Sequence, residues 1–214
     1  MLEWYFEVID HTEHDRSVAA LAVNFLDRFA AAKSIGGQLT QREYSLAAMT
    51  CLTLASKLYL SRHNYACHIS VNYVLRLAHG SYTQNDVEAS ELEVLATLKW
   101  MVHPPIVPEF IEYLFHLIPR WENDRAIRTT AFEHARYASE LALVSCVPHS
   151  EPGRMALACV LSGFQDIPCA IRNAFVRNVA HAVGLTPEGV ARERECVTFL
   201  IRSVQPQQRA NESK

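Results

Sequence analysis

The stretch from Ser45 to Ser56 carries no charged residue, and small side chains recur along it. These small residues are Ala47, Ala48, Cys51 and Ala55. A helix that is apolar on every side does not lie on the surface of a bundle, because a surface helix keeps a polar face toward water. We therefore expect residues 41–60 to form a helix in the middle of a helical bundle. Thr40, followed three residues later by Glu43, predicts a capping box at its start.

Apolar residues recur with the spacing of one helical face over residues 17–32, which predicts an amphipathic helix there. The same spacing and the turn residues between segments predict helices at 69–78, 84–99, 106–118, 124–145, 153–164, 168–184 and 187–204. In the helix at 84–99 the apolar positions are Val87, Leu92, Leu95 and Leu98. No segment has the pattern of a strand, so the predicted fold class is all-α.

The run from Val102 to Pro105, with two consecutive prolines, interrupts this series of helices. The residue before a proline is pushed out of the α region, and each proline lacks a backbone donor. The break divides the chain into two tandem five-helix bundles, which we place at 1–103 and 104–204. Residues 205–214 contain no apolar side chain larger than alanine and are predicted to form a disordered tail.

The formal charge of -3 and the pI near 6.4 do not favour nucleic acid as a partner, because phosphate recognition needs clustered lysine and arginine. No uncharged apolar stretch approaches 18 residues, so no membrane span is expected. The cysteines are scattered, and the first residues lack the positive charge and apolar core of a secretory signal. We therefore expect an intracellular protein of the nucleus, the cytoplasm or both.

No motif of an enzyme is present in the sequence. The glycines form neither a dinucleotide or phosphate-binding loop nor a nucleophile elbow. His11, Glu13 and His14 lack the spacing that places two ligands on one helical face, and the His63, Cys67 and His68 cluster lacks a second ligand pair. We predict a protein that is not an enzyme and needs no metal or cofactor.

Three charged positions interrupt otherwise apolar helices: Asp27 with Arg28, Lys57, and Glu91. Burying an ion without a partner is costly, so such positions are informative. Each can lie at an exposed helix edge, or it can contact a partner molecule. Periodicity alone favours the exposed edge.

Four ordered motifs resemble those of the cyclin family. Residues 21–29, LAVNFLDRF, resemble the LAVNYLDRF of the cyclin box, and residues 54–57 have its LASK sequence. Residues 2–8 are similar to the LVDWLVEV segment, and residues 91–98 resemble the helix in which cyclins carry a glutamate before an apolar run. The match is strong over 2–118 and looser over 120–204.

The resemblance implies a non-catalytic regulatory subunit that binds and allosterically activates a cyclin-dependent protein kinase in cell-cycle control. It implies that residues 1–103 are the kinase-binding cyclin box and that residues 104–204 are a second cyclin-like domain. Lys57 and Glu91 match the family's main polar kinase contacts. The flanking apolar contacts match Leu58, Leu95 and Trp100. Kinase substrates and inhibitors are further partners of the family.

The family's substrate-docking patch is matched only in part. The residues that match are Met1, Leu2, Trp4, Glu7 and Ser45, and the arginine of the family's Met-Arg-x-x-Leu segment is absent. Because the chain begins inside this segment, we expect an additional N-terminal segment in the natural protein. The alternative function is that of a cyclin-fold transcription adaptor or scaffold that does not activate a kinase, and the balanced charge disfavours DNA-binding adaptors.

Overall fold

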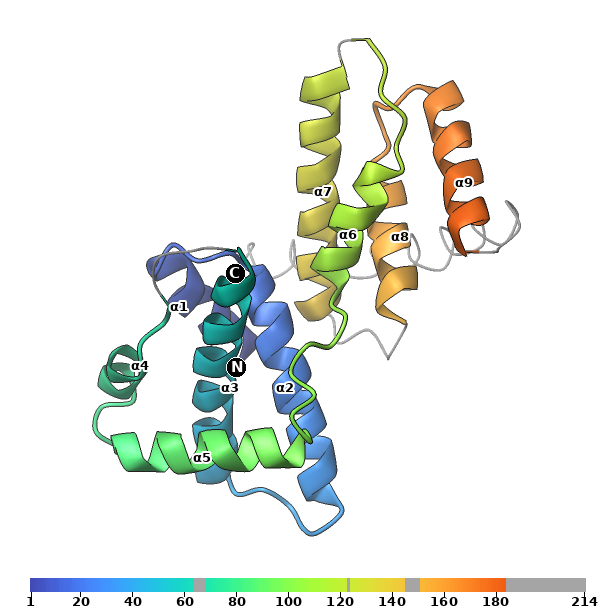
Figure 1. Ribbon diagram of the computed structural model, residues 1–214. Coiled ribbons are helices and arrows are strands. Elements are labelled where there is room, and N and C mark those ends of the chain that lie inside the picture. The colour runs from blue at the N-terminus through green and yellow to red at the C-terminus, as the bar shows by residue number, and fades with distance from the viewer. Residues whose placement is uncertain (64–67, 123, 145–150, 184–214) are drawn as a thin grey trace, which may run out of the picture. The chain divides into compact units, whose positions relative to one another are not determined.

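The computed structural model describes residues 1–63, 68–122, 124–144 and 151–183. Within these residues it contains helices and no strand (Figure 1), which confirms the predicted all-α fold. The helices are α1 (Leu2–His11), α2 (Ser17–Ser34), α3 (Gln41–His63), α4 (Val71–Leu77), α5 (Gln84–Thr97), α6 (Val107–His116), α7 (Asp124–Val144), α8 (Pro152–Ser162) and α9 (Cys169–Val183). The helix predicted at 187–204 and the predicted tail at 205–214 lie outside the described residues.

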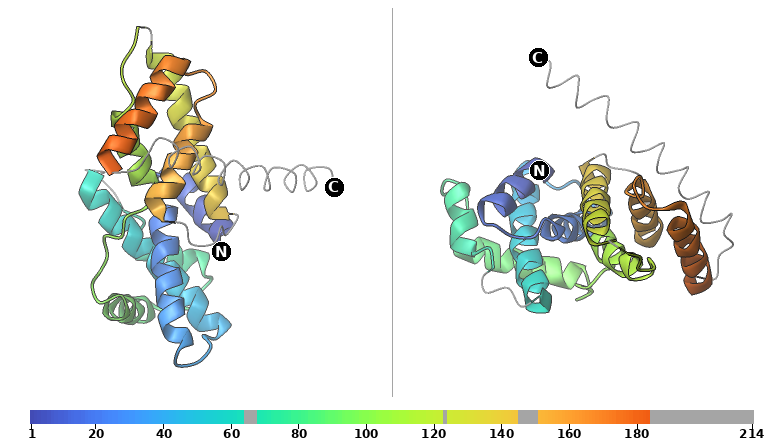
Figure 2. Two further views of the ribbon diagram at one scale, coloured as in Figure 1. Left: turned by 90° about the vertical axis from the view of Figure 1, so that its right-hand side faces the viewer. Right: turned by 90° about the horizontal axis from the view of Figure 1, so that it is seen from above.

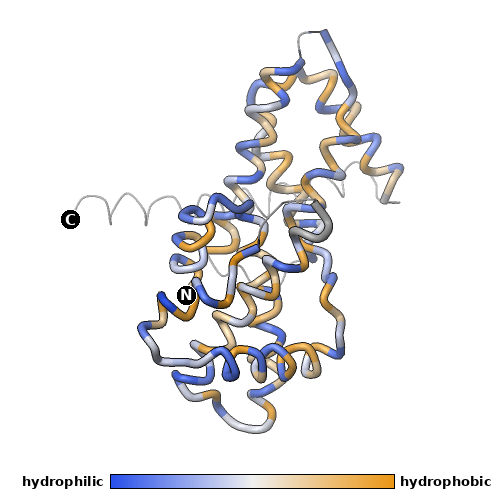
Figure 3. Tube along the Cα trace, turned by 60° about the vertical axis from the view of Figure 1, so that its left-hand side comes forward, coloured by the Kyte–Doolittle hydropathy of each residue, from blue (hydrophilic) through white to orange (hydrophobic). Residues whose placement is uncertain are grey.

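The chain divides into two compact units, Met1–Pro104 and Pro105–Lys214. Helices α1 to α5 belong to the first unit and α6 to α9 to the second. Hydrophobic and hydrophilic turns alternate along the helices of both units (Figure 3), as expected when each unit has a core of its own. None of the helices in the described residues is long and apolar enough to cross a membrane.

Helix α3 is the centre of the first unit, as the uncharged stretch predicts. Ala48, Cys51, Leu52 and Ala55 are fully buried on it. Helices α2 and α5 pack against it, with α5 crossing α3 in Figure 1. The small side chains let these neighbours approach α3 closely, and the uncharged composition follows from contact on several sides.

Helix α1 was not predicted from residue spacing, although it buries Tyr5, Val8 and Ile9 on one face. It is short, and no side chain caps its first turn. The Tyr5 hydroxyl donates a hydrogen bond of 2.8 Å to the backbone oxygen of Ala48, which ties α1 to the central helix. Burial raises the pKa of Tyr5 well above its ordinary value. Tertiary packing therefore stabilises α1 more than its local sequence does.

The capping box predicted at Thr40 is present, and a second one lies at Thr83, before α5. The Glu43 carboxylate accepts bonds from the Thr40 hydroxyl at 2.7 Å and the Thr40 amide at 2.8 Å, and the Asp86 carboxylate accepts the equivalent bonds from Thr83. In return each threonine hydroxyl accepts a bond from the backbone amide three residues later. These bonds hold the pKa values of Glu43 and Asp86 below their ordinary range, because they stabilise the charged carboxylates.

The core of the second unit forms around α8, in which every residue from Met155 to Leu161 is buried. Helix α8 lies between α7 and α9 in Figures 1 and 2, and α6 packs against it. Phe164 and Phe175 close the core in an edge-to-face pair with ring centroids 4.9 Å apart. Just after α8, a side chain added at Gly163 would lie 2.6 Å from the backbone oxygen of Ala131, so glycine permits the close contact with α7.

Two sequence expectations about α5 need correction. The helix ends at Thr97 instead of residue 99, because the two residues that follow Leu98 have left-handed backbone conformations. Leu92 does not belong to its apolar core face, since 64% of this residue is exposed to solvent. The buried residues of α5 are Val87, Ser90, Val94 and Leu95.

Candidate functional site

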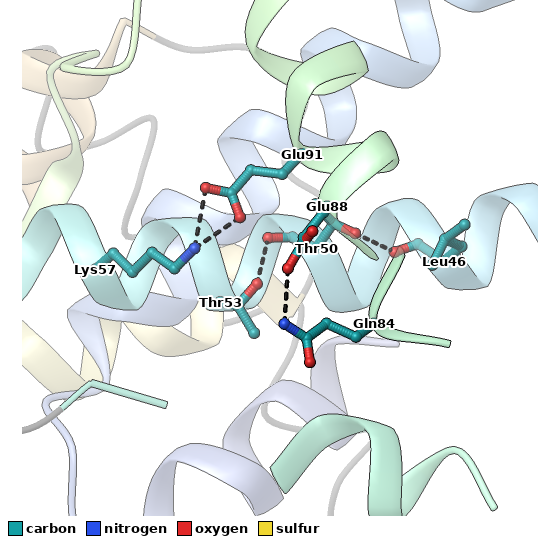
Figure 4. Close-up of polar contacts among 7 residues, drawn as sticks. All are labelled: Leu46, Thr50, Thr53, Lys57, Gln84, Glu88 and Glu91. Atoms are coloured by element: carbon teal, nitrogen blue, oxygen red, sulfur yellow. Dashed lines mark hydrogen bonds and ion pairs between the residues drawn. The ribbon is translucent and has the colours of Figure 1, made fainter. Parts of the chain in front are cut away.

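Lys57 on α3 and Glu91 on α5 meet on the surface of the first unit (Figure 4). The Lys57 Nζ atom donates to both carboxylate oxygens of Glu91, at 2.7 Å to Oε2 and 3.0 Å to Oε1. The side chains are 35% and 21% exposed, so the pair is partly shielded from water and remains accessible. Lys57 and Glu91 are 34 positions apart in the sequence, and each interrupts an otherwise apolar helix. In the structure their opposite charges neutralise each other.

The polar residues around this pair are bonded elsewhere. The Thr50 and Thr53 hydroxyls donate to backbone oxygens one turn earlier on α3, and Gln84 donates to Glu88 at 2.7 Å. Figure 4 shows Glu88 directed toward Gln84, while Glu91, the next carboxylate along α5, is directed toward Lys57. The geometry thus selects Glu91 from the acidic residues of α5.

Apolar side chains accompany the pair on both helices. Leu58, next to Lys57, is half-buried, whereas Leu95 is buried and supports the surface from within the unit. Trp100, which follows the end of α5, is 67% exposed. Leu92, next to Glu91, is exposed, although its spacing from Leu95 fits one helical face. Leu92 lies two residues before Val94, and residues two apart lie on different faces of a helix. This spacing could have indicated that Leu92 is not on the buried face.

The residues of the proposed docking patch lie at two places in the first unit. Met1, Leu2, Trp4 and Glu7 belong to α1 and the residue before it, and Ser45 is near the start of α3. Met1 and Glu7 are exposed, and the other three are half-buried. The bond from Tyr5 to α3 brings these two helices together.

Within the described residues, no three histidine, cysteine or acidic side chains gather in a way that could hold a metal ion. His11 instead stacks on Tyr73, with ring centroids 6.0 Å apart. The His63, Cys67 and His68 cluster, from which the sequence predicts no metal site, lies partly outside the described residues, since Cys67 and the His63 side chain are not described. Cys51 and Cys159 are buried, and burial raises the pKa of each thiol to about 12.

The first unit is thus a bundle of α-helices around a buried central helix, with an accessible charged pair between that helix and α5. Residues 1–103 match the family described as "Cyclin, N-terminal domain". Residues 1–103 therefore belong to the cyclin family.

Similar proteins include cyclin-D3-3 of Arabidopsis thaliana, 27% identical over 78% of this chain and 44% of that protein. G1/S-specific cyclin-D1 of Mus musculus is 26% identical over 81% of this chain and 55% of that protein. The chain therefore spans about half the length of these curated relatives. Among solved structures, a viral cyclin from herpesvirus saimiri has the same fold, with a TM-score of 0.67, 16% identity, and coverage of 95% of this chain and 83% of that one.

Proposed function

We propose that the protein is a non-catalytic regulatory subunit that binds a cyclin-dependent protein kinase and activates it in cell-cycle control. The observation that carries the proposal is the Lys57–Glu91 pair on the surface shared by α3 and α5. The names of the relatives, which include G1/S-specific cyclins, support the cell-cycle role. We expect the protein in the nucleus, the cytoplasm or both, together with such a kinase.

The Lys57–Glu91 pair is suited to binding a partner because it has hydrogen-bonding capacity that its mutual bonds do not use. A lysine ammonium has three N–H groups, and a carboxylate has about four acceptor positions, more than the mutual bonds of the pair occupy. A partner backbone can therefore place a carbonyl group against Lys57 and amide groups against Glu91. Leu92, next to Glu91 in the sequence, and Trp100, after the end of α5, are exposed and can add apolar contact area.

Activation requires that the protein bind the active arrangement of the kinase more tightly than the inactive one. In protein kinases, the glutamate of a mobile helix must pair with the lysine that positions ATP. A surface that holds this helix inward stabilises the pairing without supplying a catalytic group. The increase in kinase activity is then limited by how much more tightly this protein binds the active kinase than the inactive kinase.

A pull-down followed by a kinase assay tests the proposal against the adaptor alternative. Capture and activation of a cyclin-dependent kinase by the wild-type protein, with loss of both in the Lys57→Ala/Glu91→Ala variant, is the expected result. Capture without activation would favour a scaffold. Failure to capture any kinase would reject the proposed function.

We assign substrate docking to the partial patch at Met1, Leu2, Trp4, Glu7 and Ser45. Its role is separable from kinase binding, because these residues belong to α1 and the start of α3. Trp4→Ala should weaken phosphorylation of a docked protein substrate and leave activity on a short peptide unchanged. Equal loss on both substrates would contradict the assignment.

A further inference from the structure

After α5 and its C-cap residue Leu98, two consecutive residues have left-handed backbone conformations, Lys99 at φ 52° and Trp100 at φ 59°. Neither is glycine, and for side chains with a Cβ atom this conformation costs roughly 1 kcal/mol or more per residue. A bulky residue in this region is a true outlier. Such conformations persist where surrounding contacts enforce them, and they concentrate at functional sites.

The first of these contacts is a Schellman motif at the end of α5. The Trp100 amide donates to the Leu95 oxygen and the Lys99 amide donates to the Ala96 oxygen, both at 3.0 Å. Lys99 thus occupies the position that usually holds glycine. The motif also fixes the backbone of exposed Trp100 to that of buried Leu95.

The turn continues for two residues beyond the motif. The Met101 amide donates to the Leu98 oxygen and the Val102 amide to the Trp100 oxygen, each at 3.0 Å. Arg28 then reaches the turn from α2, where its Nη1 atom donates to the Met101 oxygen at 2.9 Å. This bond joins residues 73 positions apart in the sequence and attaches the turn to a second helix.

The backbone of the turn is therefore held on both sides, while its side chains project into solvent. Trp100 and Met101 are 67% and 62% exposed. Contiguous exposed apolar surface marks interaction sites, and tryptophan is enriched among residues that dominate binding energy. A residue whose backbone is already ordered loses less conformational freedom on association.

We propose that Arg28 is a positioning residue that holds the turn after α5, so that Trp100 is presented in advance to an apolar pocket on the kinase. The inference rests on the proposed kinase-binding function. The positioning role explains why α2, an otherwise apolar helix, carries a charge at Arg28. Residue spacing alone favoured an exposed helix edge for this charge. Arg28 acts through the Met101 carbonyl and needs no contact of its own with the partner.

The test compares Arg28→Ala and Arg28→Lys with Arg42→Ala. Arg42 is a matched control, because its Nη2 atom donates to the Ser81 oxygen at 2.8 Å near the other end of α5. Hydrogen exchange of the amides of Trp100 and Val102 is measured in the isolated protein, and affinity is measured by titration with the purified kinase. Trp100→Ala shows how much of the affinity depends on the indole.

Arg28→Ala is expected to speed exchange at both amides and to weaken kinase binding about tenfold, as when the binding-competent turn falls to about a tenth of the population. Arg28→Lys should recover part of both losses, since an ammonium group can still donate to the carbonyl. Arg42→Ala should change neither the exchange of these amides nor the affinity.

Unchanged exchange in Arg28→Ala, or an equal loss of affinity in Arg42→Ala, would overturn the positioning role. Wild-type affinity in Trp100→Ala would overturn the claim that Trp100 binds a pocket on the kinase. The proposed Lys57–Glu91 interface would not be affected by that result. If the wild-type protein binds no kinase, the proposed function fails. The exchange measurement then still decides whether Arg28 holds the turn.

Discussion

Replacing Lys57 and Glu91 with alanine, singly and together, distinguishes a surface ion pair from a contact that binds a partner. The two side chains bond to each other, so each single replacement leaves one charge without its partner. The double variant removes both charges. The four proteins form a double-mutant cycle for stability and a second one for kinase affinity.

The effect on folding should be small. At 35% and 21% exposure the pair is partly screened by water, and surface ion pairs contribute about 0–1 kcal/mol. The free energy of unfolding should therefore fall by less than about 1 kcal/mol in each variant. Binding should change far more, because truncating one member of a buried charged contact costs roughly 2–5 kcal/mol. This range corresponds to about 30-fold to several-thousand-fold in affinity.

The Lys33–Glu93 ion pair is the matched control. It joins α5 to α2, its side chains are 35% and 54% exposed, and Glu93 is two residues from Glu91. Urea unfolding gives the stability of each variant, and titration calorimetry against the kinase gives its affinity. Lys33→Ala and Glu93→Ala should keep wild-type affinity.

Affinities within about twofold of wild type for both Lys57→Ala and Glu91→Ala would refute the interface, since twofold corresponds to less than 0.5 kcal/mol. An equal loss in the Lys33 and Glu93 variants would also refute it, because the effect would then follow from the charge of the unit as a whole. A loss confined to the Lys57 and Glu91 variants supports it.

Three further predictions concern stability. Gly163→Ala should destabilise the protein by about 1–3 kcal/mol, because its Cβ atom would lie 2.6 Å from a backbone oxygen of α7, whereas the Cβ atom at Gly153 would meet only ordinary contacts from 3.7 Å. Leu157→Ala in the buried helix α8 should cost roughly 2–5 kcal/mol, while kinase affinity of the folded fraction hardly changes. The lowered pKa values of Glu43 and Asp86 should contribute stability that is complete above their ordinary values of 4.5 and 3.8 and is lost as pH falls through the lowered values.

Each of these has a direct check. Chemical unfolding compares the two glycine variants, and equal stabilities would contradict the steric argument. For Leu157→Ala, a large loss of affinity without loss of stability would place the binding surface in the second unit. For the carboxylates, replacing the two capping threonines with alanine should reduce the acid-dependent loss of stability, and an unchanged pH profile would contradict the assignment.

The local sequence was sufficient to predict most of the helices in the described residues. Capping boxes at Thr40 and Thr83 depend on side chains three residues apart, so they can be recognised without tertiary information. The uncharged run from Ser45 to Ser56 predicted a central buried helix, since no other environment suits a helix without a polar face. The motifs at 21–29 and 54–57 carried the family assignment, and the matched range 1–103 includes them.

Only the tertiary structure decided how the side chains of these helices are used. Leu92 and Leu95 are both leucines on α5, yet packing leaves Leu92 exposed and buries Leu95. The Lys57–Glu91 and Arg28–Met101 bonds join residues 34 and 73 positions apart. Periodicity describes one helix at a time, whereas these contacts depend on how two helices cross and on where a turn leaves the helix axis. The sequence therefore determined the helices and the family, and packing determined which charges pair and which apolar residues remain exposed.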